Sequence, residues 1–259
     1  MRVVSLACSN TEIVCALGCA EMLVGVDDHS DHPPEVVRAL PRVGPDLGVD
    51  PARVAALSPD LVLASLTVPG HERVVESLEA VGLPLLVLAP KRLDDVFHDV
   101  RRIAEALGVP ARGEALAAEL ERGLAPLPPI GERPPRILVE WWPRPVIAPG
   151  KKSWVTDLIE RAGGVNPLAG DDVESRPLTD EEAAALAPDA VVLSWCGVPF
   201  EKYRPDVVRR REAFAKTPAL VHDRVCCISE AHLGRPGPRL VDGLRELREV
   251  VRACVENSA

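Results

Sequence analysis

Short runs of mostly apolar residues alternate with amphipathic stretches along most of this chain. The runs are bounded by Gly, Pro, Asp or Ser, and they predict buried strands at residues 2–6, 23–26, 61–64, 85–88, 137–140, 190–194 and 225–228. The stretches between them repeat apolar positions every three or four residues, and they predict helices at 11–17, 51–57, 71–81, 155–161, 180–186, 205–216 and 238–255. This alternation indicates an α/β fold in which helices cover both faces of parallel sheets.

Two consecutive helices interrupt the alternation in mid-chain. They are predicted at 93–107 and 111–124 with no strand between them, and the prolines that follow end the second one. The sequence therefore predicts an N-terminal α/β lobe at 1–108, a bridging helix with a Pro-rich linker at 109–133, and a C-terminal α/β lobe at 134–259.

The two predicted lobes share a short internal repeat. Residues 54–65 (VAALSPDLVLAS) and 183–194 (AAALAPDAVVLS) both have the pattern of a helix, a Pro-Asp turn and a buried strand that ends in Ser. Two similar parallel sheets are expected to form a ligand cleft at the carboxyl ends of their strands.

Three of the four tryptophans lie in residues 134–166. Trp141 and Trp142 follow a predicted strand and precede a Pro-rich loop with Arg144, which we expect to form neither strand nor helix. Ser153 is predicted to cap a helix whose apolar face includes Trp154. Because adjacent strand residues face opposite ways, we predict that one of Trp141 and Trp142 is a flat ligand surface and that Trp154 is core packing.

Composition and missing motifs exclude several functions. The chain has 30 basic and 39 acidic residues, and its net charge of −9 argues against nucleic acid or an anionic membrane as the main partner. No apolar run approaches the ~20 residues that span a bilayer. A nucleophile elbow, a zinc-protease motif, a P-loop and a dinucleotide-binding glycine motif are all absent, so the sequence does not predict an enzyme.

The start of the chain and its cysteines bear on location. Ser9 and Glu12 have the spacing of a capping box for the first helix. The residues 5–8 (SLAC) look like a lipoprotein cleavage box, but the seven residues before Cys8 are too few for a signal peptide. The seven cysteines are odd in number and lack CxxC spacing, so we expect reduced, mostly buried thiols. These features predict a cytoplasmic protein, or a periplasmic or extracellular one if a leader has been removed.

The motifs together resemble the periplasmic-binding-protein superfamily that has a rigid helical backbone, and within it the cobalamin-binding branch. The residues that carry the resemblance are 2–6, 9–12, 30–34, 54–62, 150–153, 163–166 and 238–240. It covers nearly the whole chain and implies two lobes joined by one long helix. It also implies a non-catalytic solute-binding protein of an ABC transporter, with cobalamin or a related corrinoid as a flat ligand between the lobes. Alternatives are a siderophore, haem or metal-ion binder, or a cytosolic cofactor-handling protein or enzyme on the same frame.

The resemblance also places candidate site residues. In the N-terminal lobe they are Cys8, Ser9, Asn10, His29, His32, Ser65 and Leu66. In the C-terminal lobe they are Trp141, Trp142, Arg144, Trp195, Cys196, His232 and Arg235. For docking to a membrane permease, the family uses an exposed Glu on each lobe; Glu72 matches the first, and Gly234 stands in the place of the second.

Two groups of these residues have alternative interpretations. His29, His32, His71 and His232 can bind a metal directly, but no acidic ligand set accompanies them, so we interpret them as polar residues of the cleft. His29 and His232 are also candidates for an axial ligand to a corrinoid cobalt. Arg235 lies at a helix start that suits an anion, and a salt bridge to Asp242 or Glu246 is the alternative.

Overall fold

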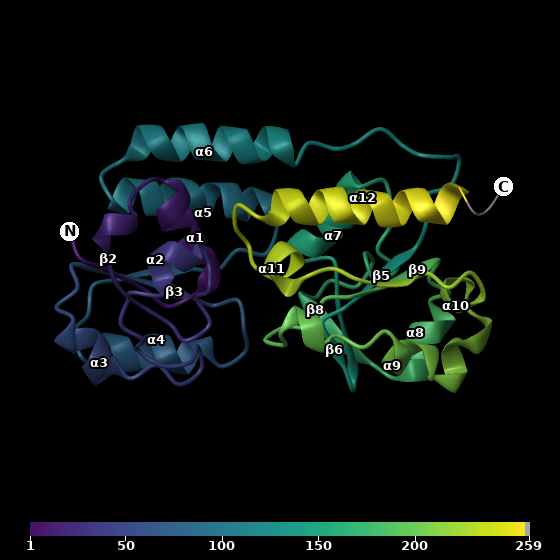
Figure 1. The fold of residues 1–259 in the computed structure, drawn as a ribbon, viewed down its shortest axis with the longest axis horizontal. Helices are drawn as coiled ribbons and strands as arrows, with labels where there is room; N and C mark the ends of the chain where they lie inside the picture. Colours follow the sequence, from purple (N-terminus) through teal and green to yellow (C-terminus); the bar gives the residue numbers. More distant parts are fainter. Residues whose placement is uncertain (257–259) are drawn as a thin grey trace. The chain divides into compact units, whose positions relative to one another are not determined.

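The computed structural model describes residues 1–256 and divides into two compact units. Residues 1–90 and 94–121 form unit 1, and residues 91–93 with the chain from 122 onward form unit 2. The division therefore falls within the segment 109–133 that was predicted as a bridge. Each unit is an α/β structure with a parallel sheet, as the hydrophobic pattern predicted (Figure 1).

Unit 1 is built on a four-stranded parallel sheet in the order β2-β1-β3-β4. Its strands are β1 (Val3–Ser5), β2 (Leu23–Val26), β3 (Leu61–Ser65) and β4 (Leu85–Leu88). Its helices are α1 (Cys8–Ala16), η1 (Ala20–Met22), α2 (Pro34–Val37), α3 (Pro51–Ala56), α4 (His71–Glu79), α5 (Leu93–Ala106) and α6 (Pro110–Gly123). In Figure 1, α5 and α6 lie on one side of the sheet and α3 and α4 on the other, which explains why its strands are apolar on both faces.

The first helix begins earlier than predicted, and the predicted capping box is wrong. Helix α1 starts at Cys8 with Ala7 as its N-cap, and no side chain caps it. Ser9 and Glu12 instead lie inside the helix and are 7 % and 4 % exposed. The backbone N–H of Thr11 donates to the carbonyl of Ala7 at 3.1 Å, which closes the first helical turn directly after β1.

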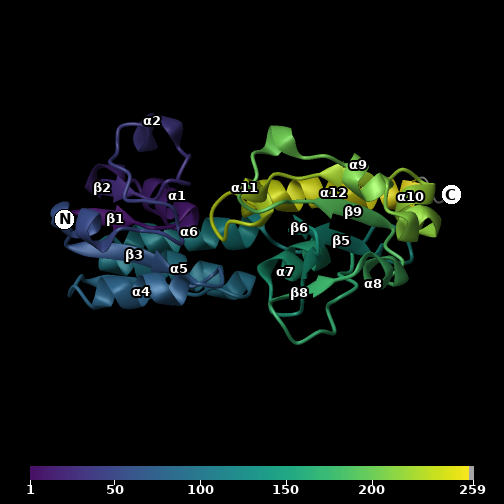
Figure 2. The same ribbon diagram turned by 90° about the horizontal axis from the view of Figure 1, so that it is seen from below.

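Unit 2 contains two three-stranded sheets. The parallel sheet has the order β10-β9-β5, with β5 (Ile137–Glu140), β9 (Ala190–Leu193) and β10 (Val225–Cys227). The second sheet is antiparallel and has the order β6-β7-β8, with β6 (Trp142–Pro143), β7 (Val146–Pro149) and β8 (Ser175–Leu178). Figure 2 shows the same elements from below, with β6 beside β5.

The antiparallel sheet contradicts the prediction of an irregular Pro-rich loop after Trp142. Proline is tolerated in strands at edges and ends, where no ladder N–H is needed. Pro143 lies in the two-residue edge strand β6, and Pro149 is the last residue of β7. The three prolines of this segment therefore did not exclude strands.

The helices of unit 2 are α7 (Trp154–Arg161), α8 (Asp180–Ala185), η2 (Phe200–Lys202), α9 (Asp206–Arg209), η3 (Glu212–Lys216), α10 (Pro218–Val221), α11 (Glu230–Leu233) and α12 (Leu240–Glu256). The single helix predicted at 205–216 is thus broken into short pieces. In Figure 1, α7 and α12 lie on one side of the parallel sheet, and α8, α9 and α10 lie on the other. The predicted cap is confirmed, because the Ser153 hydroxyl accepts a hydrogen bond from the Val155 N–H at 3.2 Å.

The internal repeat is confirmed by matching hydrogen bonds in the two units. Asp60 accepts a hydrogen bond from the backbone N–H of Arg2 at 2.7 Å, just before β1. Asp189 accepts one from the backbone N–H of Arg136 at 2.8 Å, just before β5. In each unit the Asp of the Pro-Asp turn therefore ties the repeat to the start of the neighbouring parallel strand.

Candidate functional site

The carboxyl ends of the parallel strands in unit 2 bring several predicted residues to one edge of the sheet. Trp141 follows β5, and Cys196 lies just beyond β9. Their backbones are joined directly, because the Cys196 N–H donates to the Trp141 carbonyl at 3.1 Å. Ligands of parallel α/β sheets bind at this edge, so it is the part of unit 2 where a solute site is expected.

The tryptophan pair presents one exposed ring and one ring that packs inward. Trp142 is 43 % exposed on β6, whereas Trp141 is partly buried with its ring centroid 6.3 Å from that of Trp154. Trp154 is 7 % exposed, and its indole N–H donates to the Leu233 carbonyl at 2.7 Å. The prediction that Trp154 belongs to the core is confirmed. The opposite exposures of Trp141 and Trp142 agree with the alternation expected for a strand end.

Trp195 lies in the core of unit 2 and not on its surface. It is 5 % exposed, and its ring centroid is 5.5 Å from that of Tyr203, whose hydroxyl donates to the Trp195 carbonyl at 2.9 Å. The next residue, Cys196, is exposed. We therefore leave the Trp195 ring out of the proposed site and retain Cys196.

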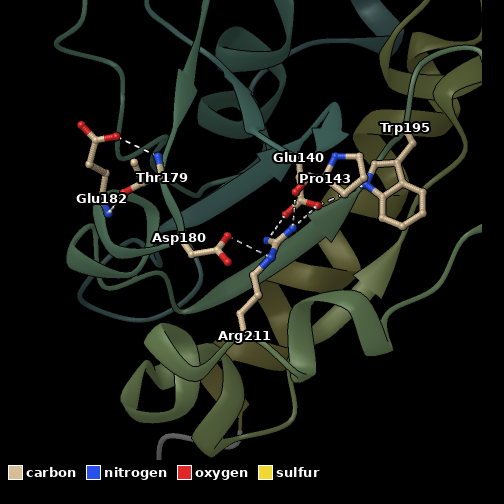
Figure 3. A network of polar contacts seen from close by, with 7 residues as sticks. All are labelled: Glu140, Pro143, Thr179, Asp180, Glu182, Trp195 and Arg211. Atoms are coloured by element: carbon tan, nitrogen blue, oxygen red, sulfur yellow. Dashed lines mark hydrogen bonds and ion pairs between the residues drawn. The ribbon is translucent and has the colours of Figure 1, made fainter.

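A buried ion pair that the sequence did not predict involves Glu140, the residue just before the tryptophan pair (Figure 3). Glu140 is fully buried at the end of β5 and accepts two hydrogen bonds from the Arg211 guanidinium, at 2.6 and 3.1 Å. Arg211 also donates to the carbonyl of Pro143 at 2.9 Å and pairs with Asp180 at 3.2 Å. The indole N–H of Trp195 donates to Glu140 at 3.2 Å. One feature of the sequence could have indicated this ion pair: the last residue of the otherwise apolar strand β5 is the acidic Glu140.

His232 and Arg235 are both engaged by carboxylates. The Nδ1 atom of His232 is 2.6 Å from an Oε1 atom of Glu246. Arg235 donates to the carboxylate of Glu230, five residues before it in the chain, at 3.2 Å. The predicted roles of both residues in binding a solute remain predictions.

The predicted residues of unit 1 divide into accessible and buried groups. Cys8 and Leu66 are partly exposed, and His29 and His32 are exposed. In contrast, Ser9, Asn10 and Ser65 are 7 %, 3 % and 7 % exposed. Their polar groups are used internally, since Asn10 donates to the Ala64 carbonyl at 3.4 Å and Ser65 bonds Thr67 at 2.9 Å.

Asp46 of unit 1 lies between two imidazoles. The sequence did not predict this arrangement. Its carboxylate oxygens are 3.5 Å from Nε2 of His29 and 3.7 Å from Nε2 of His71. His71 beside it holds the pKa of Asp46 below its usual value, and the Leu47 N–H, which donates to the carboxylate at 2.9 Å, acts in the same direction. Within residues 1–256, no group of three or more His, Cys, Asp or Glu side chains is arranged to hold a metal ion.

The lowered pKa of Asp46 makes a prediction about acid stability. A depressed folded-state pKa contributes stability above the unfolded value of about 4, and this contribution is lost as the pH falls through the folded value. Asp46→Asn should therefore cost up to about 1 kcal/mol of unfolding free energy at neutral pH, since the carboxylate is partly exposed. Urea denaturation of both proteins from neutral pH to pH 3 should show the difference shrinking below about pH 4. A constant difference would contradict the electrostatic role.

Only one of the two expected docking positions carries a glutamate. Glu72 is exposed in the first turn of α4, where it accepts a hydrogen bond from the Gly70 N–H at 2.9 Å. The backbone N–H groups of Glu72 and Gly70 lower the pKa of this carboxyl. Gly234 follows α11, where a Cβ atom would come within 2.8 Å of the Glu230 side chain. Docking through Glu72 alone remains a prediction.

None of the seven cysteines, all of which lie within residues 1–256, forms a disulfide in the structure, and their surroundings differ. Cys196 is exposed, whereas Cys19 and Cys254 are buried. Desolvation raises the pKa of Cys196 to about 12 and the pKa of Cys254 and of Cys15 to about 11, which leaves little thiolate near neutral pH.

We predict that iodoacetamide modifies Cys196 before Cys19 and Cys254 in the native protein, because Cys196 is exposed and the other two are buried; the raised pKa of the Cys196 thiol should make even this reaction slow near neutral pH. Cys19 and Cys254 should react only after unfolding, and all seven thiols should react in denaturant without reductant. Mass spectrometry of proteolytic peptides gives the order of modification. Native labelling of Cys254 as fast as that of Cys196, or a disulfide in protein taken from cells, would contradict this arrangement.

Comparison with known proteins gives the class to which this fold and site belong. The model of the family described as Periplasmic binding protein matches residues 3–231, so the chain belongs to this family. An uncharacterised ABC transporter substrate-binding lipoprotein of Bacillus subtilis, YvrC, is 27 % identical over 258 residues, which cover 96 % of this chain and 79 % of the relative.

Two further relatives have names that state a ligand. The vitamin B12-binding protein of Pectobacterium atrosepticum is 26 % identical over 247 residues, covering 93 % of this chain and 84 % of the relative. The solved apo structure of the periplasmic heme-binding protein RhuT of Roseiflexus sp. RS-1 matches with a TM-score of 0.81 and 30 % identity, covering 98 % of each chain. The resemblance stated from the sequence motifs is thereby confirmed.

The comparisons establish a coarse function and correct one expectation. The chain is a non-catalytic solute-binding protein of the type that serves ABC importers. The expectation of a cytoplasmic location is not supported, because the relatives are named as periplasmic proteins or as a lipoprotein. None of the described helices is long and apolar enough to cross a membrane.

Proposed function

We propose that the solute is cobalamin or another corrinoid, which this protein holds by stacking on the exposed ring of Trp142. The observation that carries the proposal is that ring: it is 43 % exposed in a chain with only 3 % aromatic residues. The vitamin B12-binding relative supports the corrinoid as the flat ligand. Burying a tryptophan face and the matching ligand face stabilises a complex by roughly 25 cal/mol per Å² of apolar area, before ordering costs.

Polar residues of each unit suit the rim or the metal of a corrinoid, whose rim carries amide groups. Arg144 is exposed two residues after Trp142 on the β6–β7 hairpin and can donate to amide or phosphate oxygens. In unit 1, the exposed imidazoles of His29 and His32 are of the type that ligates cobalt or iron axially.

That the ligand is captured between the lobes stays a prediction, as does delivery to a permease through Glu72. We also place the protein outside the cytoplasm, as its relatives are.

Haem is the second candidate, because the haem-binding relative is 30 % identical over 98 % of both chains. Haem is also flat and would stack on the same tryptophan surface, and the imidazoles of His29 and His32 are of the class that ligates haem iron. The two candidates differ at the rim, where haem presents carboxylates and a corrinoid presents mainly neutral amides. Arg144 would favour the first through charge and accept the second through hydrogen bonds.

Titration calorimetry with a panel of solutes tests the proposal. We expect cyanocobalamin or dicyanocobinamide to bind with a Kd in the micromolar range or below, and to quench tryptophan emission. Haem that binds while both corrinoids give no heat would replace the corrinoid by the second candidate. Absence of heat with all three would overturn the proposal, and native mass spectrometry of protein from its source cells would then show what occupies the site.

A further inference from the structure

We infer that Arg211 is a positioning residue for the ligand surface formed by the Trp142 ring. The inference rests on the proposed function, and it goes beyond it by assigning a buried residue of another segment to the same site. Arg211 itself does not present a surface to a solute, because its side chain is only 3 % exposed.

One guanidinium group holds both ends of the tryptophan dipeptide. Arg211 makes two hydrogen bonds to the carboxylate of Glu140, which immediately precedes Trp141, at 2.6 and 3.1 Å. It also donates to the carbonyl of Pro143, which immediately follows Trp142, at 2.9 Å. Figure 3 shows these contacts converging on Arg211 from the β5 end and from β6. The planar fork of arginine fixes angles as well as distances, so the chain between the two anchors is held in one orientation.

The backbone fixes the Trp141 end of the dipeptide more firmly than the Pro143 end. The Trp141 N–H donates to the Ile147 carbonyl at 2.7 Å and the Trp141 carbonyl accepts from the Cys196 N–H at 3.1 Å, whereas β6 itself is two residues long, with Trp142 opposite Ile147 and Pro143 opposite Val146. Pro143 has no N–H to donate, so its carbonyl is its one backbone hydrogen-bonding group. The bond from Arg211 to this carbonyl therefore ties the Pro143 end of the dipeptide to a buried side chain.

The anchor is itself held by further contacts, and its main partner is buried. Glu140 is fully buried, and its Oε1 atom also accepts the Trp195 indole N–H at 3.2 Å. The Nε atom of Arg211 pairs with Asp180, at the start of α8, at 3.2 Å. Hydrogen bonds between charged groups are strengthened in such a low-dielectric environment. Movement of the hairpin would break several of these bonds together.

The matched variants for the test are Arg211→Lys and Arg209→Lys. Lysine keeps the positive charge for Glu140 but loses the fork that reaches Pro143. Arg209 lies two residues away, is 39 % exposed and pairs with Asp223 and Asp206, so its replacement is the control. Each variant is first checked for folding by circular dichroism. Glu140→Gln keeps the shape of that side chain and repeats the test from the other partner if Arg211→Lys does not fold.

The first readout needs no ligand. Acrylamide quenching of Trp142 is obtained on the empty protein as the difference between each variant and the same variant with Trp142→Phe. We expect a larger quenching constant for Trp142 in Arg211→Lys and an unchanged one in Arg209→Lys. Unchanged quenching in folded Arg211→Lys would overturn the inference and leave the proposed function intact.

The second readout is dicyanocobinamide affinity in a double-mutant cycle with Trp142→Ala. Arg211→Lys should weaken binding about tenfold when Trp142 is present and have little further effect when it is absent, because the two residues act through one surface. Equal losses in both backgrounds would show a general effect on the fold and overturn the inference. A Trp142→Ala protein that binds like the wild type would instead overturn the proposed function, whatever Arg211→Lys does.

Discussion

Arg211→Met is expected to lower the free energy of unfolding by about 3–5 kcal/mol, which is the usual cost of breaking a buried ion pair from one side. The substitution leaves the carboxylate of Glu140 without its cation in a fully buried position. It also leaves the Pro143 carbonyl without its Arg211 donor. Because folded domains are stable by only about 5–15 kcal/mol, this would be a large share of the total.

Urea denaturation at neutral pH measures the effect, with Arg209→Met as the control. The exposed control should cost less than about 1 kcal/mol, as exposed ion pairs usually do. In addition, the double variant with Glu140→Leu should recover much of the loss, because it removes the uncompensated charge. A cost below about 1 kcal/mol for Arg211→Met alone would mean that the pair is not buried as described.

Trp154→Ala is expected to lower the free energy of unfolding by about 3–5 kcal/mol, the range for truncating a buried tryptophan. The side chain is 7 % exposed at the start of α7, and its indole N–H is bonded to Leu233. The ring also packs against Trp141, so its loss leaves a cavity and removes an aromatic contact.

Chemical denaturation followed by circular dichroism tests this without relying on tryptophan emission. Trp142→Ala is the matched comparison, because it removes the same side chain from a position that is 43 % exposed. We expect that variant to lose less than half as much stability as Trp154→Ala. Equal losses would show that both rings serve the core.

Much of the fold followed from local patterns in the sequence. Buried parallel strands such as β3 and β9 are apolar runs bounded by turn residues, and the helices before them have a clear helical period. The Pro-Asp repeat was visible because residues 54–65 and 183–194 share the same local pattern of a helix, a Pro-Asp turn and an apolar strand. These features depend on neighbouring residues, so one sequence is enough to predict them.

The features that were missed depend on contacts between distant segments. Strand β8 pairs with β7 across about thirty residues, and β6, β7 and β8 each contain a proline, so no local period marks them. The partner of Glu140 lies 71 residues further on, and nothing in the local sequence specifies it. A strand end was also a poor guide to exposure, because Trp195 packs against Tyr203 whereas its neighbour Cys196 is exposed.

The sequence was enough to predict that the site has an exposed tryptophan, but not which of the other candidate side chains are buried. That one tryptophan of the 141–142 pair would be exposed followed from strand geometry, and the structure shows it to be Trp142. That Ser9 and Asn10 would be buried did not follow, because it depends on where α1 begins.

The measurement that tests the central claim most directly is the affinity of Trp142→Ala for dicyanocobinamide, determined by titration calorimetry beside the wild type. If the solute stacks on this ring, the variant should keep its melting temperature and lose at least about 2 kcal/mol of binding free energy, close to thirtyfold in Kd. Wild-type affinity in the folded variant would contradict the account.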